Sequence, residues 1–157
     1  MQKNPKIRKA AAKDIPEIIL LLKKLNAFEK RIAKIAAYRK GFEKAEARQL
    51  RKKIRSAQHA VIVAESQGKI VGFCNTRIDN WQQKFEKKKW IEINEVFIEK
   101  EYRKQGIATK MIRTAEHLLK GKFDGTELFV LNGNKQAKKL YKKLGYKETI
   151  ALFLKEN

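Results

Sequence analysis

The chain has 157 residues, of which 43% are hydrophobic, and this is enough apolar material for the core of one domain over residues 1–157. Two prolines and one cysteine exclude a proline-rich linker and an intrachain disulfide framework. A formal net charge of +21 predicts attraction to polyanions, although lysines spread over every segment are equally typical of a lysine-rich proteome.

Short apolar runs typical of strands alternate along the chain with longer amphipathic runs typical of helices. Lys6–Lys9 is a predicted strand, and Asp14 followed by Pro16 marks the start of a helix. The apolar run Ile18–Leu22 in this helix is short and runs into two lysines, which indicates an amphipathic helix rather than a signal or a membrane span. We therefore expect a cytoplasmic protein that does not associate with membranes.

The remaining elements alternate in the same way, so we expect an α/β fold with a sheet of mixed direction. Cys74 lies in an apolar strand and is expected to be a small buried hydrophobe. In chain order the predicted elements are helical residues from about 29 to 56 with a break at Gly41, a hairpin of Ala60–Glu65 and Ile70–Ile78, a polar loop at Asp79–Lys89, a strand at Trp90–Ile98, a helix reaching Leu119, a strand at Glu127–Leu131, a helix after Asn134 and a last strand at Tyr146–Leu154.

The clearest functional signal is the turn Arg103–Ala108, which joins a predicted strand to a predicted helix. The first N–H groups of a helix have no partner within it, and the helix dipole adds partial positive charge there. Gly106 lets an anion approach the backbone closely, while Arg103 and Lys104 add full charge and Thr109 a hydroxyl. This pattern predicts a site for a phosphate-bearing ligand, and a basic turn capped by glycine is the alternative interpretation.

A second motif runs from Asn134 to Tyr146. Asn134 is a predicted N-cap, Gly145 occupies a helix C-terminal position, and apolar residues between them recur at helical spacing. Taken alone, Tyr141 would be interpreted as a helix residue that packs its ring on the core.

Together, the two motifs lie about 25 residues apart and resemble the GNAT superfamily of acyl-CoA-dependent N-acyltransferases. The resemblance is specific over Trp90–Tyr146 and general before it. It implies a single-domain GNAT-like fold with a mixed, mostly antiparallel twisted sheet flanked by about four helices. It also implies acetyl-CoA as cosubstrate. No metal is expected, because neither His59 nor His117 has a Cys or carboxylate partner at ligand spacing.

The resemblance also assigns residues to the cosubstrate. Backbone amides from Gln105 to Thr109 would bind the pyrophosphate, the strand before them would bind the pantetheine arm, and Tyr141 would protonate the departing thiolate. The implied cofactor-binding residues are Val96, Phe97, Ile98, Arg103, Lys104, Gln105, Gly106, Ile107, Ala108, Thr109 and Asn134.

Chemistry at an amine requires a base, because an ammonium cannot attack a thioester until it loses a proton. Members of the family place such a carboxylate at positions matching Glu92 or Glu95. Strand alternation sets these two residues on opposite faces, but the corresponding family strand often carries a bulge, so parity does not decide between them. We favour Glu92 with Glu95 close behind, and Glu127 is the next candidate; a solvent-facing glutamate is the alternative interpretation.

The predicted function is therefore transfer of an acetyl group from acetyl-CoA to an amine by direct attack in a ternary complex. A protein N-terminus, a lysine or a small-molecule amine could be the acceptor, and polycations are favoured only if Glu92, Glu95 and Asp79 create a local acidic pocket. The alternative is a basic nucleic-acid- or ribosome-binding protein on a GNAT-like scaffold with weak or no catalysis, for which Trp81, Phe85 and Trp90 would supply stacking rings. The basic surface could bind the ribosome, RNA or an acidic protein. A homodimer is left open.

Overall fold

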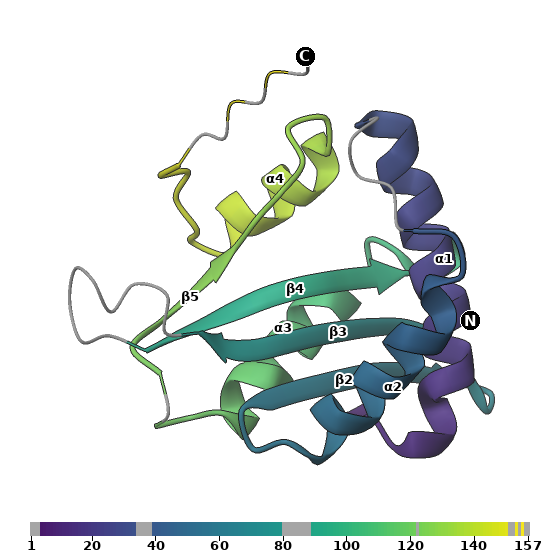
Figure 1. The fold of residues 1–157 in the computed structure, drawn as a ribbon. Helices are drawn as coiled ribbons and strands as arrows, with labels where there is room; N and C mark the ends of the chain where they lie inside the picture. The colour runs from purple at the N-terminus through teal and green to yellow at the C-terminus, as the bar shows by residue number, and fades with distance from the viewer. Residues whose placement is uncertain are drawn as a thin grey trace.

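A five-stranded sheet forms the centre of the protein, in a computed structural model that describes residues 4–33, 39–79, 89–121, 123–150, 153 and 155 (Figure 1). The strands lie side by side in sequence order; the first four are antiparallel, and the last pair is parallel. Their bounds are β1 (Lys6–Lys9), β2 (His59–Ser66), β3 (Lys69–Asp79), β4 (Trp90–Ile98) and β5 (Gly125–Leu128). The predicted mixed, mostly antiparallel sheet is confirmed.

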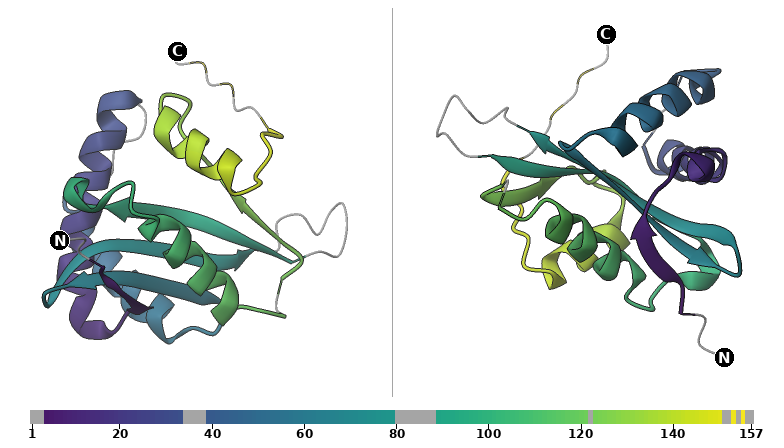
Figure 2. Two further views of the ribbon diagram at one scale, coloured as in Figure 1. Left: turned by 180° about the vertical axis from the view of Figure 1, so that it is seen from behind. Right: turned by 90° about the horizontal axis from the view of Figure 1, so that it is seen from below.

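Four α-helices flank this sheet in the described part of the chain, two on each face (Figure 2). Helices α1 and α2 pack on one face, whereas α3 and α4 pack on the other. Their bounds are α1 (Ile15–Ile32), α2 (Phe42–Arg55), α3 (Ile107–Leu118) and α4 (Lys135–Lys143), and short 3-10 turns lie at Ala12–Asp14 and Lys100–Tyr102.

Strand β2 shows why the apolar runs are nearly continuous in sequence. Val61 and Val63 belong to the core under α1 and α2, whereas Ile62 between them belongs to the core under α3. All three side chains are fully buried. A strand covered on both faces needs apolar residues at successive positions.

Glycines mark the breaks between elements as predicted. Gly41 has φ 75° immediately before α2, so the predicted interruption of the helical region is confirmed. Gln67 (φ 51°) and Gly68 (φ 75°) form the tight turn of the β2–β3 hairpin.

Strand β5 pairs along its whole length, but only with the first half of β4. The register runs from Trp90 opposite Gly125 to Ile93 opposite Leu128, while β4 continues to Ile98. Beyond this point the chain that follows β5 turns away from β4 toward α4 (Figure 1). The second half of β4 therefore has an edge that β5 does not cover.

The predicted last strand at Tyr146–Leu154 is wrong for its described residues, because residues 146–150 are not in a strand. The cause lies in where Glu148 binds. Its carboxylate accepts Lys138 Nζ at 2.7 Å and Lys142 Nζ at 2.9 Å, and both lysines belong to α4. These two ion pairs hold the segment along the helix instead of beside β5.

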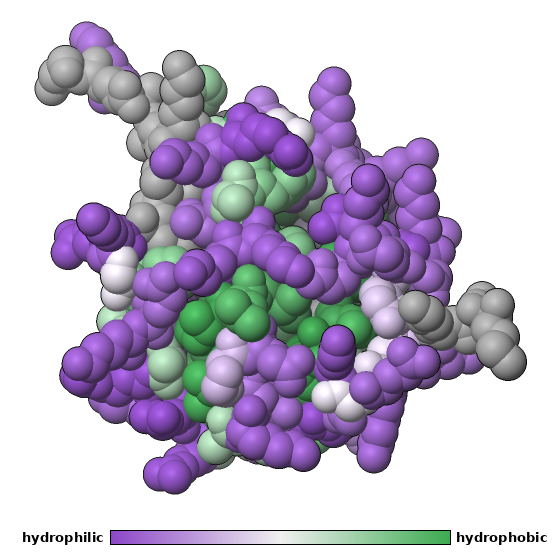
Figure 3. Space-filling view, turned by 90° about the vertical axis from the view of Figure 1, so that its right-hand side faces the viewer, coloured by the Kyte–Doolittle hydropathy of each residue, from purple (hydrophilic) through white to green (hydrophobic). Residues whose placement is uncertain are grey.

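The surface is dominated by charged side chains. The face on which α1 lies is mostly hydrophilic, with an apolar area near its centre (Figure 3). Among the described residues, no helix combines the length and apolar content needed to cross a membrane.

A buried ion pair ties β1 to the start of α1. The Asp14 side chain is 4% exposed and accepts Arg8 Nη1 at 2.7 Å and Arg8 Nη2 at 2.9 Å. It also accepts the Ala11 N–H at 2.7 Å. The hydrogen bond from Arg8 lowers the pKa of Asp14, whereas burial opposes that shift. Because the folded-state pKa is depressed, this contribution to stability is complete above the unfolded pKa and is lost as pH falls through the folded value.

We predict that Asp14→Asn lowers the free energy of unfolding by about 3 kcal/mol at neutral pH, because it leaves a guanidinium without its buried partner. Urea unfolding measures the change. Glu65→Gln is the matched control: the Glu65 side chain is 29% exposed and Arg8 keeps Asp14, so its loss should cost no more than about 1 kcal/mol. Equal losses for both variants would contradict this prediction.

Candidate functional site

A bulge in β4 decides where its carboxylates point. Asn75 lies opposite Glu95, but Thr76 lies opposite Ile93, so Asn94 is an extra residue in β4. Glu92 and Glu95 are therefore on the same face of the sheet, the one covered by α1 and α2. Simple alternation would have separated them.

Glu92 is held in an ion pair. Arg77 Nε donates to Glu92 Oε2 at 2.8 Å, and Arg77 Nη2 lies 3.0 Å from Asp79 Oδ2. The residue is 8% exposed, and burial raises the pKa of Glu92 overall although Arg77 opposes the shift. A carboxylate that already binds a guanidinium is less available to accept a proton from an amine. Glu127 lies beside Glu92 in the β4–β5 register.

Glu95 has a different environment. Asn75 Nδ2 donates to Glu95 Oε2 at 2.6 Å, and in the described part of the chain Glu95 makes no ion pair. Burial is the main cause that raises the pKa of Glu95; Lys53 lowers it, and Glu46 raises it further. A half-buried carboxylate with a raised pKa is suited to accept a proton near neutral pH.

The turn before α3 has the shape that the first motif predicts. Lys104 (φ 60°) and Gly106 (φ 74°) are both left-handed, and Gly106 is the N-cap of α3 without a side-chain cap. The Lys110 N–H bonds to the Gly106 carbonyl at 3.0 Å, so the N–H groups of the three residues between them belong to the uncapped first turn. A Cβ on Gly106 would have no atom within 4 Å. This open concavity lined by N–H groups fits a phosphate.

Side chains in this turn fasten it to β4. Arg103 Nε donates to the Ile98 carbonyl at 2.8 Å, and its guanidinium lies 5.4 Å from the centre of the Phe97 ring. Gln105 Nε2 donates to the Glu101 carbonyl at 3.1 Å, and the side chain of Ile107, the first residue of α3, is buried in the core. Arg103 thus positions the turn as well as adding charge to it.

The second motif forms α4 as expected. Asn134 Oδ1 accepts the Ala137 N–H at 3.1 Å, so the predicted N-cap is confirmed. Tyr141 packs against the core under α3, with its ring centre 5.6 Å from that of Tyr146 in an edge-to-face arrangement. Burial raises the pKa of Tyr141, so its hydroxyl stays protonated.

The predicted site residues fall on the two faces of the sheet. Glu92 and Glu95 lie on the α1 and α2 face, whereas Tyr141 lies on the α3 and α4 face. Val96 and Ile98 pack toward α3, and Phe97 packs toward α1 and α2. β4 carries residues of both faces, and its edge beyond Ile93 is not paired with β5.

Sequence reasoning missed the polar partners of the carboxylates. Asn75 and Arg77 lie on one face of β3, and the polar run Asn75–Arg77 after an apolar stretch was the available signal. Glu29 and Glu46 come from α1 and α2, and only folding brings them near β4. Trp81 and Phe85 lie outside the described residues. The ring of Trp90 packs on Gly125, where an added Cβ would come within 2.6 Å of it.

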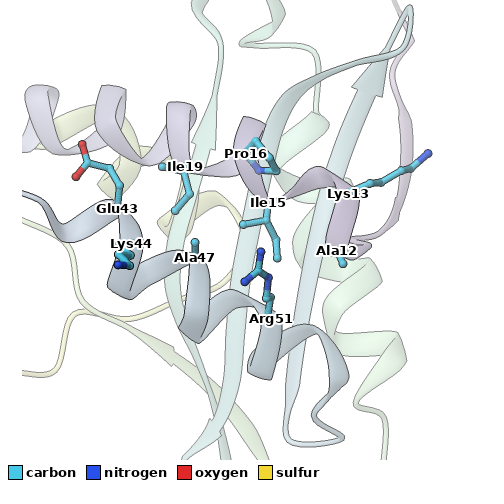
Figure 4. A pocket seen from close by; sticks show the side chains of 9 residues that line it. All are labelled: Ala12, Lys13, Ile15, Pro16, Ile19, Glu43, Lys44, Ala47 and Arg51. Atoms are coloured by element: carbon cyan, nitrogen blue, oxygen red, sulfur yellow. The ribbon is translucent and has the colours of Figure 1, made fainter.

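A shallow groove of about 480 Å³ lies elsewhere, between the start of α1 and α2 (Figure 4). Ile15 and Ile19 contribute to its wall from α1, and Ala47 and Arg51 from α2. Its described lining includes none of the predicted site residues. The groove is therefore separate from the residues that the sequence predicted for the site.

Comparison with known proteins places this arrangement among acetyltransferases. Residues 27–146 match the sequence profile described as the acetyltransferase (GNAT) family. An uncharacterised N-acetyltransferase of Archaeoglobus fulgidus is 40% identical over 84 residues, which are 52% of this chain and 55% of that protein. The chain thus spans about half the length of this curated relative.

Solved structures share the whole fold. The BH1408 protein of Bacillus halodurans, solved as a tetramutant, has a TM-score of 0.78 at 20% identity, over 95% of this chain and 99% of that one. A predicted acetyltransferase of Clostridium acetobutylicum, solved with acetyl-CoA, has a TM-score of 0.76 at 21% identity, over 97% of this chain and 95% of that one.

The buried environment of Glu95 should affect how the free energy of unfolding depends on pH. Because its pKa is raised in the folded protein, stability falls as pH rises from the unfolded value through the folded value, and it stays reduced at neutral pH. Glu95→Gln keeps the bond from Asn75 but removes the charge, so it should raise the free energy of unfolding at pH 7.5 more than at pH 4. Urea unfolding at the two pH values measures this.

Glu148→Gln is the control with the opposite sign. Lys138 and Lys142 lower the pKa of Glu148 to about 2, so removing that charge should not stabilise the protein at pH 7.5. A Glu95→Gln variant that is less stable than the wild type at pH 7.5 would contradict the assigned environment.

Proposed function

The chain belongs to the acetyltransferase (GNAT) family, and from that membership we propose that it transfers an acetyl group from acetyl-CoA to an amine. The parted edge of β4 is the single observation that carries the proposal. Glu95 and Tyr141 lie on opposite faces of the sheet. One ligand can meet both only where β4 and β5 have separated, beyond Ile93 and Leu128.

The described residues fit acetyl-CoA, and the relative from Clostridium acetobutylicum that was solved with it supports this assignment. The backbone N–H groups from Gln105 to Thr109 would hold the pyrophosphate at the start of α3, and Lys104 would add charge. The backbone of Val96–Ile98 would hold the pantetheine arm along the free edge of β4. When bound there, acetyl-CoA supplies an activated thioester carbonyl.

Glu95 would then act as the general base and Tyr141 as the general acid. Glu95 accepts a proton from the ammonium of the acceptor, directly or through water, and frees the nitrogen lone pair. The C–N bond forms, the nitrogen gives up its second proton to water, and the C–S bond breaks, so that its electron pair leaves with the sulfur. Tyr141 donates its proton to that sulfur and regains one from water, while Glu95 releases its proton to water. Backbone N–H groups of β4 polarise the carbonyl during the attack.

Two environments lead us to assign the base to Glu95 rather than to Glu92, the residue that we favoured from the sequence. Glu92 holds Arg77 at 2.6 Å and would have to give up an ion pair to take a proton. Glu95 has a neutral donor, Asn75, at 2.6 Å. Its raised pKa places the acidic limb of the pH–rate profile above the value for an ordinary glutamate.

For the phosphate site, we predict that Gly106→Ala weakens coenzyme A binding at least about tenfold, because a Cβ would occupy the concavity and strain the left-handed turn. Calorimetry measures the dissociation constant. Gly68→Ala is the matched control, since Gly68 (φ 75°) is equally left-handed and equally open but lies in the β2–β3 turn. Equal affinity of the two folded variants for coenzyme A would contradict this site.

For the base, Glu95→Gln should lower turnover roughly 10²–10⁴-fold and change the acidic limb of the pH–rate profile. Glu92→Gln, made in the neighbouring carboxylate, should stay within about tenfold of wild type. Release of free thiol from acetyl-CoA in the presence of an amine measures both. The assignment fails if Glu92→Gln causes the larger loss, or if neither variant loses turnover.

A further inference from the structure

Five carboxylates gather on the α1 and α2 face of a strongly basic protein. The chain has 38 Lys and Arg residues against 17 Asp and Glu, so a local excess of acid is unexpected. We call this group the acidic cluster; it consists of Glu29, Glu46, Asp79, Glu92 and Glu95.

Four different elements contribute to the acidic cluster. Glu29 comes from α1 and Glu46 from α2, and each interacts electrostatically with Glu95 of β4. Asp79 and Glu92 share Arg77, at 3.0 Å and 2.6 Å. The cluster therefore surrounds the proposed base and does not follow one helix face.

Basic side chains balance only part of this charge. Glu46 accepts Lys53 Nζ at 3.1 Å, and Arg77 serves both Asp79 and Glu92. Among the described residues Glu29 and Glu95 make no ion pair, so the negative charge around Glu95 is only partly balanced when these carboxylates are ionised. Burial, together with Glu95, raises the pKa of Glu29, as expected for a carboxylate that has no ion pair with the described residues.

A buried amide in the cluster also lacks a partner. Asn75 is 1% exposed, and its Nδ2 donates to Glu95 Oε2 at 2.6 Å. Its Oδ1 accepts no hydrogen bond from the described residues. Buried acceptors are normally satisfied, so this oxygen, on the amide that binds Glu95, calls for an N–H donor or an ordered water that relays one. An acceptor amine can supply such a donor.

We propose that the acceptor is a dicationic or polycationic amine, with the amine to be acetylated held beside Glu95 and Asn75 and a second cationic group held by Glu29 and Glu46. This rests on the proposed function of the same site. A neutral or anionic acceptor would leave the excess carboxylates unpaired, whereas a second cation on the substrate would pair with them. The same excess attracts cations locally despite the positive charge of the whole molecule.

The first experiment compares amines that differ only in the second charge. Thiol release from acetyl-CoA is measured with 1,4-diaminobutane, spermidine and n-butylamine, and with a short basic peptide whose only amines are lysine side chains. The kcat/KM for 1,4-diaminobutane or spermidine should exceed that for n-butylamine at least about tenfold, mainly through a lower KM. A peptide that outperforms both free polyamines would assign the cation pair to a protein acceptor and overturn a small-molecule one.

The second experiment changes the cluster. Glu29→Gln and Glu46→Gln should each raise the KM for 1,4-diaminobutane about threefold to fivefold, and leave the KM for n-butylamine unchanged. Glu43→Gln is the matched control on α2: it removes the same charge three residues away, where Glu43 pairs with Lys23 at 3.1 Å. It should leave both KM values unchanged.

Calorimetry with 1,4-diaminobutane on the coenzyme A-bound protein gives a readout that does not need turnover. Binding that weakens in Glu29→Gln and Glu46→Gln but not in Glu43→Gln supports the cation site. The absence of thiol release with every acceptor would count against the proposed function but not against this cation site. Turnover that favours n-butylamine, or equal KM effects in Glu43→Gln and Glu46→Gln, would overturn the cation site and leave acetyl transfer standing.

Discussion

The rest of the site depends on one constraint: β5 ends beside the middle of β4, so the second half of β4 has an edge that β5 does not cover. Parallel pairing holds the two strands from Trp90 and Gly125 to Ile93 and Leu128, and then ends while β4 continues. The unpaired N–H and C=O groups on that edge need partners, and an extended ligand can supply them. At the end of the same strand, the uncapped turn at Gly106 offers N–H groups to a phosphate. One strand edge thus leads from the phosphate site to the proposed base.

The bulge at Asn94 adds a second constraint. By inserting one residue opposite β3, it turns Glu95 to the face that already carries Glu92. The arrangement costs stability, because burial works against the charged form of Glu95. Ion pairs elsewhere in the fold, such as that of Arg8 with Asp14, stabilise the protein and help to offset this cost. Such a desolvation cost is expected where the pKa of a group is shifted for proton transfer.

Local patterns predicted the fold well, and long-range contacts limited the rest. The strand Trp90–Ile98 has the predicted bounds, and the breaks at Gly41 and Gly68 follow from left-handed backbone that favours glycine. The predicted last strand was wrong because the residue pattern of one segment does not show whether another strand lies beside it. In the structure Glu148 pairs with lysines of α4 instead. The bulge depends on the pairing of β3 with β4, so no count along one strand reveals it. Glu29 and Glu46 reach Glu95 only through helix packing.

Hydrogen exchange of backbone amides, with and without acetyl-CoA, tests the central claim most directly. Binding along the parted edge of β4 should slow exchange at residues 95–98 and 105–109 together, because both segments offer N–H groups to one extended ligand. The hairpin turn at Gln67 and Gly68 should exchange at an unchanged rate. Protection confined to the groove between α1 and α2, or protection of only one of the two segments, would contradict the account.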